Sequence, residues 1–254
     1  DIAGPGPGLR YPPGTVNVLR TKTGLRLSQH GVVISELRTI AGPTHSLFDL
    51  LAALIHTLAP TGRVGILGFA GGGMVAPLRA LGVDRQIASV DLDREAYELF
   101  RRECPAWVGQ VAWSEGDAAD WLERQRRPFD LIVEDLSIPQ DGDVFKPSIC
   151  WEGLPRLIAS RLAPHGVAVF NLLKPAHGRW NPEFAALVAR FSKAHLLGLE
   201  EFENRIVVAG SRLPSARALG GALRRGLRGI RSRQAGRLRV QRLDPPGPTP
   251  YPGR

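Results

Sequence analysis

The 254-residue sequence predicts an α/β fold whose sheet is mostly parallel and ends in an antiparallel hairpin. From Arg63 onward, short apolar runs alternate with segments of helical spacing, as buried strands alternate with the helices that cover them. Near the end, two apolar runs flank Glu203-Asn204, which indicates a hairpin rather than another strand–helix unit.

Ahead of this sheet, we expect an irregular N-terminus over residues 1–14 and a small antiparallel β region over 15–43. The first of these segments is rich in Gly and Pro. The second holds the short apolar runs VNVLR, LRL and VVISEL, with a turn expected at His30-Gly31.

Residues 44–211 are predicted to form the main domain, which opens with a helix capped by Thr44 or Ser46. The later helices are the amphipathic segments between apolar runs. The strands are expected at VGILGF, QIASVDL, QVAWSE, FDLIVEDL and GVAVFNLL, and the closing hairpin at AHLLGLEEF and RIVVAGS.

The composition excludes several classes of protein. No run of about 18 apolar residues is present, so no membrane span is expected, and the first residues lack the basic and apolar regions of a signal peptide. The two cysteines, Cys104 and Cys150, form no disulfide framework and no metal-type Cys/His spacing. We therefore expect a cytoplasmic protein without a metal.

The net charge of +9 lies almost entirely in the last part of the chain. Residues 211–254 hold eleven Arg and one Asp, whereas residues 1–210 hold 22 basic and 23 acidic residues. This distribution argues against nucleic-acid binding by the main domain. For residues 212–254 the favoured interpretation is a largely disordered, solvated extension. The alternative is a tether to nucleic acid or to an anionic surface.

The stretch GILGFAGGGMVAPL leads from a strand through three consecutive glycines into a helix. Glycine permits positive φ and the close approach of another group, and a helix start offers backbone N–H groups. We predict that this loop lines a cofactor site, through Gly68, Gly71, Gly72 and Gly73. The alternative is a tight turn without a ligand.

Acidic residues follow the next two strands at the same edge of the sheet. Asp91 comes about 20 residues after the glycines, the spacing of a ribose-binding acid, while a helix-capping role fits Asp93 better. Asp117 can accept from an adenine amino group or cap the helix that follows it. Because open α/β sheets bind ligands at this edge, a nucleoside-containing cofactor is predicted.

Glu134 and Asp135 end the fourth strand, in FDLIVEDLSIP. A carboxylate at this edge, beside a cofactor, could deprotonate or position an attacking amine. The alternative is a pair of solvated loop acids.

Residues from about 15 to 210 resemble the spermidine synthase (polyamine aminopropyltransferase) family of the class I S-adenosylmethionine-dependent transferases. The resemblance lies in VGILGFAGGGMVAPLRAL, SVDLD, GDAADWL, FDLIVEDLSIP and RLAPHGVAVFNL. It implies a Rossmann-like class I methyltransferase fold, with Asp91 on the ribose, Asp117 on the adenine and Asp135 as general base. It also implies S-adenosylmethionine or decarboxylated S-adenosylmethionine as co-substrate, and a homodimer paired through the N-terminal strands.

The sequence departs from this family on the side of the amine substrate. Gly71 stands where the family has an Asp near the transferred group, and Ile138 where it has a second acid in the catalytic segment. Leu47 and Phe48 replace a Tyr-Gln pair that meets the polyamine. A polyamine is a string of ammonium groups that carboxylates or aromatic faces must hold. The cofactor side is therefore preserved better than the amine side.

Three functions stay open at this point. The preferred one is aminopropyl transfer from decarboxylated S-adenosylmethionine to a small amine, as in polyamine biosynthesis, with Asp135 as the base. The second is methyl transfer from S-adenosylmethionine to another nucleophilic acceptor on the same fold. The third is a non-catalytic, nucleoside-binding protein.

Overall fold

The computed structural model describes residues 16–140, 142–151, 153–173 and 180–243. The predicted irregular N-terminus over 1–14 lies outside these ranges, as do residues 244–254 of the predicted tail. Within the described ranges, no helix has the length and apolar character needed to cross a membrane.

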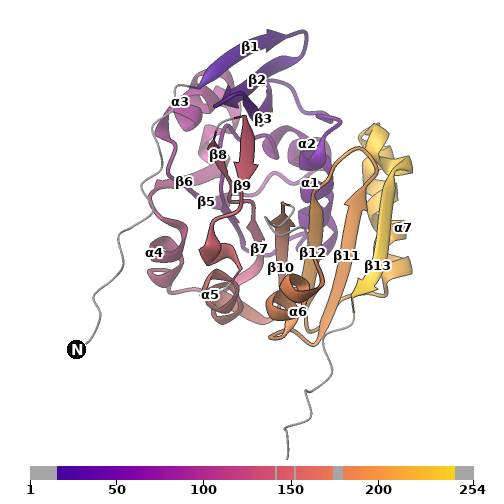
Figure 1. Ribbon diagram of the computed structural model, residues 1–254. Helices are drawn as coiled ribbons and strands as arrows, with labels where there is room; N and C mark the ends of the chain where they lie inside the picture. The colour runs from indigo at the N-terminus through magenta and orange to yellow at the C-terminus, as the bar shows by residue number, and fades with distance from the viewer. Residues whose placement is uncertain (1–15, 141, 152, 174–179, 244–254) are drawn as a thin grey trace, which may run out of the picture.

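A central sheet of eight strands, in the order β13-β11-β12-β10-β7-β4-β5-β6, organises the molecule (Figure 1). Five neighbouring strands are parallel, and the strands beyond β10 join it by antiparallel pairing, so the predicted α/β fold with a closing hairpin is confirmed. The parallel strands are β4 (Val64–Leu67), β5 (Ile87–Asp91), β6 (Val111–Glu115), β7 (Phe129–Glu134) and β10 (Leu162–Leu172), followed by β11 (Lys193–Leu199), β12 (Arg205–Gly210) and β13 (Leu238–Leu243).

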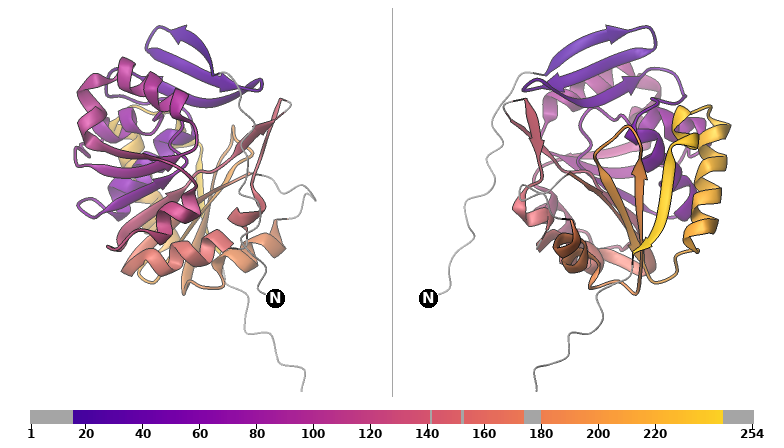
Figure 2. Two further views of the ribbon diagram at one scale, coloured as in Figure 1. Left: turned by 90° about the vertical axis from the view of Figure 1, so that its left-hand side faces the viewer. Right: turned by 45° about the vertical axis from the view of Figure 1, so that its right-hand side comes forward.

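Helices cover both faces of the sheet (Figure 2). Neighbouring residues of β7 show the two layers, because Val133 belongs to the core under α1 and α7, whereas Ile132 belongs to the core under α4 and α5. The helices are α1 (Leu47–Leu58), α2 (Val75–Ala80), α3 (Arg94–Glu103), α4 (Ala118–Glu123), α5 (Gly153–Arg161), α6 (Asn181–Val188) and α7 (Ala216–Gly229), with short 3-10 turns at η1 (Pro105–Gln110), η2 (Ser148–Cys150) and η3 (Arg233–Gly236).

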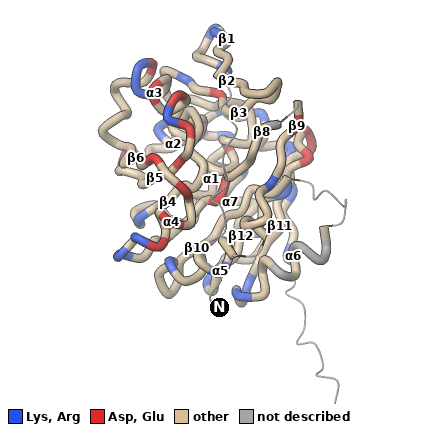
Figure 3. Tube along the Cα trace, turned by 60° about the vertical axis from the view of Figure 1, so that its left-hand side comes forward, with Lys and Arg blue, Asp and Glu red and all other residues tan. Residues whose placement is uncertain are grey.

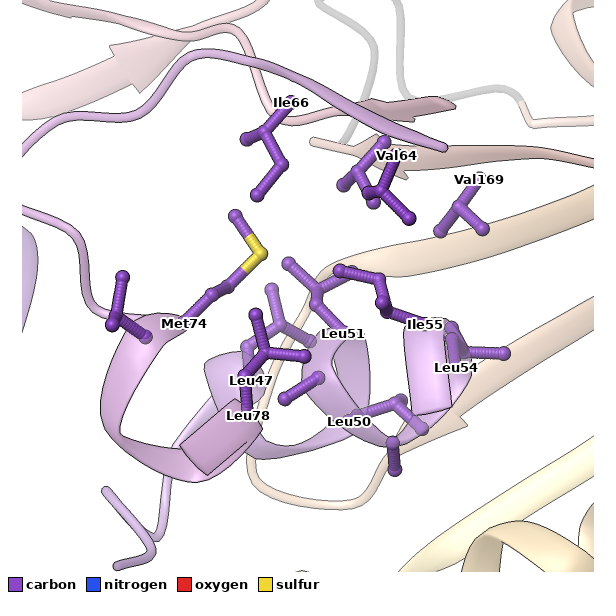
Figure 4. Packing of buried hydrophobic residues seen from close by; sticks show 14 of the residues in the cluster. Leu47, Leu50, Leu51, Leu54, Ile55, Val64, Ile66, Met74, Leu78 and Val169 are labelled. Atoms are coloured by element: carbon purple, nitrogen blue, oxygen red, sulfur yellow. The ribbon is translucent and has the colours of Figure 1, made fainter. Parts of the chain in front are cut away.

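Helix α1 anchors the core on its side of the sheet. Ser46 caps it, since its Oγ accepts from the backbone N–H of Phe48 at 3.3 Å, while Thr44 bonds instead to the Asp49 carboxylate. A fully buried leucine or isoleucine stabilises the fold by roughly 1.5–3 kcal/mol. Figure 4 shows part of this core. It combines Leu47, Leu50, Leu51, Leu54 and Ile55 of α1 with Val64, Ile66, Met74, Leu78 and Val169.

The predicted N-terminal β region is a separate three-stranded antiparallel sheet of β1 (Asn17–Thr21), β2 (Gly24–Gln29) and β3 (Val32–Arg38). It lies across one end of the main sheet (Figure 2). The predicted turn is confirmed: His30 and Gly31 have φ angles of 48° and 82°, as a two-residue hairpin turn requires. Pairing of two protomers through these strands stays a prediction.

The prediction of a largely disordered tail from residue 212 is wrong for the described part of that segment. Residues 216–229 form α7, and β13 pairs with β11 at the edge of the sheet, so the main domain does not end at 211. Leu219, Leu223 and Leu227 recur every fourth residue and are fully buried. The many Gly and Arg residues of the segment concealed this apolar stripe.

Candidate functional site

A cavity of about 670 Å³ lies at the carboxyl edge of the parallel strands. Its walls come from the ends of β4, β5, β7 and β10, from β3, from the start of α1, and from the antiparallel pair β8 (Ile138–Gln140) and β9 (Asp143–Phe145), which the sequence did not predict. Four of the predicted site residues line it: Gly68, Asp91, Asp117 and Asp135.

The three consecutive glycines are placed differently from the prediction. They are buried, and none of them lines the cavity. A Cβ atom at Gly71 would lie 2.2 Å from Leu27 Cδ1, and one at Gly73 would lie 2.7 Å from the Phe48 ring. Gly72 has a φ of 74° and packs beside the aromatic rings of Phe69 and Phe100. The atoms that exclude a side chain at these positions belong to this chain, and contact of the three glycines with a cofactor stays a prediction.

Gly68 is the one glycine of the predicted set that lines the cavity, and it has both the positive φ and the close backbone approach expected of the loop. Its φ is 87°, and a Cβ atom there would lie 2.6 Å from the backbone oxygen of Asp135. The neighbouring backbones are tied, because Asp135 N donates to Leu67 O at 2.8 Å. Glycine therefore lets the end of β4 pass close to the end of β7 and brings both to the cavity wall.

Asp91 ends β5 and holds the loop after β4. Its Oδ2 accepts from the backbone N–H of Ala70 at 2.6 Å, and its Oδ1 from that of Asp93 at 2.9 Å. Burial raises the pKa of Asp91, against the effect of these bonds. The backbone of Phe69 also donates to Asp91. A carboxylate has about four acceptor positions, so it can still accept from a ribose hydroxyl. Asp93 instead caps α3, accepting from Ala96 N at 3.0 Å.

Asp117 caps α4, one of the two roles that its position suggested. Its Oδ1 accepts from the backbone N–H groups of Ala119 at 2.8 Å and Asp120 at 3.1 Å. Both bonds use the same oxygen, so Oδ2 can accept from another donor, such as an adenine amino group. Acidic residues recur in this region beside β5, β6 and α4 (Figure 3).

Asp135 follows β7 directly and accepts from Asn171 Nδ2 at 2.5 Å through Oδ1. Asn171 lies on β10 and accepts in turn from Asn204 Nδ2 at 3.0 Å. Desolvation raises the pKa of Asp135 to about 7, while the Asn171 bond and the charge of Lys146 oppose the rise. A carboxyl group that titrates near neutrality in a cavity has the property expected of a general base.

Glu134 has a different role from its neighbour, although the sequence presented the two acids as a pair. It is 1% exposed and forms an ion pair of 2.7 Å with Lys146 Nζ, which also donates to Leu136 O. Cys150 Sγ lies 3.5 Å from the same Glu134 oxygen, and its burial raises the pKa of the thiol. This cluster fixes the chain on both sides of the β8–β9 pair. Both cysteines are free, as expected.

Sequence reasoning missed several residues of the cavity wall. The segments that contain Asn171 and Asn204 were predicted as a strand and a hairpin, and neither asparagine was predicted to belong to the site. Arg233 lies in the segment predicted to be disordered, yet η3 packs against the start of α1: Arg233 N donates to His45 Nδ1 at 3.4 Å, and Gln234 Nε2 to His45 O at 2.6 Å. The folded C-terminal segment thus completes one side of the cavity.

The residues that the structure describes form no recognisable metal site. No group of three His, Cys, Asp or Glu side chains is placed there to hold an ion.

No protein-family model matches the sequence, and no curated protein matches it either. Solved structures do match. A probable spermidine synthase from Corynebacterium glutamicum is 17% identical, with a TM-score of 0.69 over 93% of this chain and 91% of that one. The spermidine synthase from Thermotoga maritima is 14% identical, with a TM-score of 0.58 over 79% and 70%.

Two further solved structures contain a bound ligand. A spermidine synthase in complex with the transition-state analogue AdoDATO is 14% identical, with a TM-score of 0.60 over 79% of this chain and 71% of that one. Human methyltransferase-like protein 13 in complex with SAH is 20% identical, with a TM-score of 0.52 over 72% and 90%. This chain has the class I methyltransferase fold. Structures named as spermidine synthases are among its structural neighbours, as the sequence resemblance implied.

Proposed function

We propose that the protein is an aminopropyltransferase that uses decarboxylated S-adenosylmethionine as donor and an amine as acceptor. The observation that carries the proposal is the position of Asp135. Its carboxyl group has a pKa of about 7 and lines the same cavity as Asp91 and Asp117. Asp91 would hold the ribose hydroxyls of the donor, and Asp117 the adenine amino group.

Asp135 supplies the proton transfer. An acceptor ammonium loses its proton to the carboxylate, and the freed nitrogen lone pair forms a bond to the carbon next to the donor sulfonium. The carbon–sulfur bond breaks, and its electron pair stays on sulfur, giving methylthioadenosine. In this proposal the donor and the acceptor lie side by side in the cavity, and their proximity supplies most of the lowering of the barrier.

Methyl transfer from intact S-adenosylmethionine is the second candidate. Arg26 and Arg233 both line the cavity, and a guanidinium can pair with the amino-acid carboxylate that the intact donor keeps. Methyl transfer also needs fewer groups to hold an amine.

Calorimetric titration with the two donors and with methylthioadenosine tests the proposal. We expect tighter binding of the decarboxylated donor, lost in Asp91→Ala and kept in the control Asp120→Ala, which changes an exposed acid of α4. Preference for intact S-adenosylmethionine would shift the function to methyl transfer. Absence of binding by all three would overturn both and leave a protein that kept the fold without the donor.

A further inference from the structure

We infer that the acceptor carries a single amine on an apolar body and is not a polyamine. The inference rests on the proposed function and concerns the acceptor side of the same cavity. It follows from how the charged groups of the cavity wall are already used and from the apolar groups between them.

The carboxylates in the described part of the wall leave no second site for an ammonium group. Among the described residues that line the cavity, Glu36 is paired with Arg26 at 2.9 Å. Asp93 caps α3 through Oδ1 and its Oδ2 is buried, while Asp117 caps α4 and is assigned to the adenine by the proposed function. Asp91 holds two backbone N–H groups at the predicted ribose position. Asp135 is thus the one described lining acid that the proposed function leaves for the acceptor nitrogen. A diamine or polyamine whose ammonium groups are held by carboxylates needs at least one more acid.

The two arginines of the wall add no site for a second ammonium group. Arg26 is paired with Glu36 at 2.9 Å, and Arg233 lies 3.8 Å from Glu201, so each of these acids already faces a guanidinium. An acceptor with one nitrogen, placed at Asp135, needs no further partner.

Apolar side chains supply the rest of the acceptor side. They come from three parts of the fold and form an apolar wall in the same cavity as Asp135: Val33 and Ile34 on β3, Leu47 and Phe48 on α1, and Ile138, Pro139 and Val144 on the β8–β9 pair. An alkyl or aryl body of the acceptor would bury its own surface here.

A matched pair of amines tests the inference. Hexylamine and 1,6-diaminohexane have the same carbon chain and differ in the second ammonium group. Their binding is measured calorimetrically at pH 8, with and without methylthioadenosine, followed by product masses with decarboxylated S-adenosylmethionine. We expect hexylamine to bind at least about ten-fold more tightly and to be the better acceptor. Equal or tighter binding of the diamine, or no binding of either amine, would overturn the inference.

A substitution provides the converse test. Ile138 is half-buried in the cavity wall, so Ile138→Asp adds a carboxylate without opening the core. It should raise affinity for the diamine at least about ten-fold, whereas Ile138→Leu should leave the preference unchanged. An unchanged preference in folded Ile138→Asp would contradict the inference. Because the amine titrations need no donor, failure of donor binding would overturn the proposed function while the acceptor preference is still measured.

Discussion

Asn171 donates a 2.5 Å hydrogen bond to the carboxylate of Asp135 across two neighbouring parallel strands. The register explains the contact: Phe170 on β10 lies opposite Glu134 on β7, so the next residue of each strand reaches the same edge of the sheet. An amide donor favours the ionised carboxylate less strongly than a cation would. Desolvation therefore outweighs this bond and the charge of Lys146, and it raises the pKa of Asp135 to about 7.

The first prediction is a pH dependence of transfer. Asp135 accepts a proton only when ionised, so kcat/KM should rise as the pH passes through about 7 and fall on the acid side. An alkylamine acceptor, with a pKa near that of lysine at about 10, stays protonated across this range. Asp135→Asn should abolish transfer and leave donor binding in place. Asn171→Leu removes a bond to the ionised form, so the midpoint should move to higher pH, and an unmoved midpoint would exclude this role for Asn171.

The second prediction concerns the buried ion pair beneath the β8–β9 pair. Lys146 and Glu134 are 3% and 1% exposed, so removal of the cation leaves a buried charge without compensation. Lys146→Met should lower the free energy of unfolding by about 3–5 kcal/mol, measured by urea titration. The double variant Lys146→Met/Glu134→Gln should recover most of this loss. Equal destabilisation of the single and double variants would show that the charge is not the cause.

The strand ends of the site were predictable because they depend on local pattern. Asp91, Asp117 and Asp135 each follow an apolar run, and parallel strands end at one edge, so their approach to a common cavity follows from chain order. Asn171 follows an apolar run by the same rule. It was missed because an asparagine inside a strand carries no signal until its neighbour across the sheet is known.

The remaining differences arise from contacts between distant segments. Nothing near Gly71 in sequence reveals that Leu27 packs against it, so a loop shaped by the chain's own packing looked like a loop shaped by a ligand. In the C-terminal segment, the sequence shows Leu223 but does not show which surface of the fold its side chain packs against. Helix α7 is stable because α1 and β13 receive its apolar stripe, and propensity alone underestimates such a helix.

The third prediction tests whether Gly71 is required for internal packing or for contact with a cofactor. Gly71→Ala should lower the free energy of unfolding by about 1–3 kcal/mol, because the added methyl group overlaps Leu27. Donor affinity of the folded variant should be unchanged. Gly109→Ala is the control, since a Cβ atom at that position meets nothing within 4 Å. A large loss of donor affinity without loss of stability would return Gly71 to the cofactor site.

The fourth prediction concerns the basic face of α7. Arg217, Arg225 and Arg228 are exposed, and residues 212–242 contain ten Arg and no acidic residue, so this folded face presents the charge that the tether hypothesis needs. Deletion of the segment is an unsuitable test, because it would remove β13 and the buried leucines of α7. The triple change of these arginines to glutamine keeps that packing and should leave the melting temperature nearly unchanged.

The triple variant should bind duplex DNA or RNA more weakly at low salt if the tether exists. Each lost phosphate contact reduces the slope of log affinity against log salt by about 0.9 for a B-form duplex, so three contacts would reduce it by about 3. Leu223→Ala is the structural counterpart and should cost about 2–5 kcal/mol of stability, since Leu223 is fully buried. Unchanged nucleic-acid binding by the triple variant would exclude the tether and leave the basic face as a solvated surface of the folded α7.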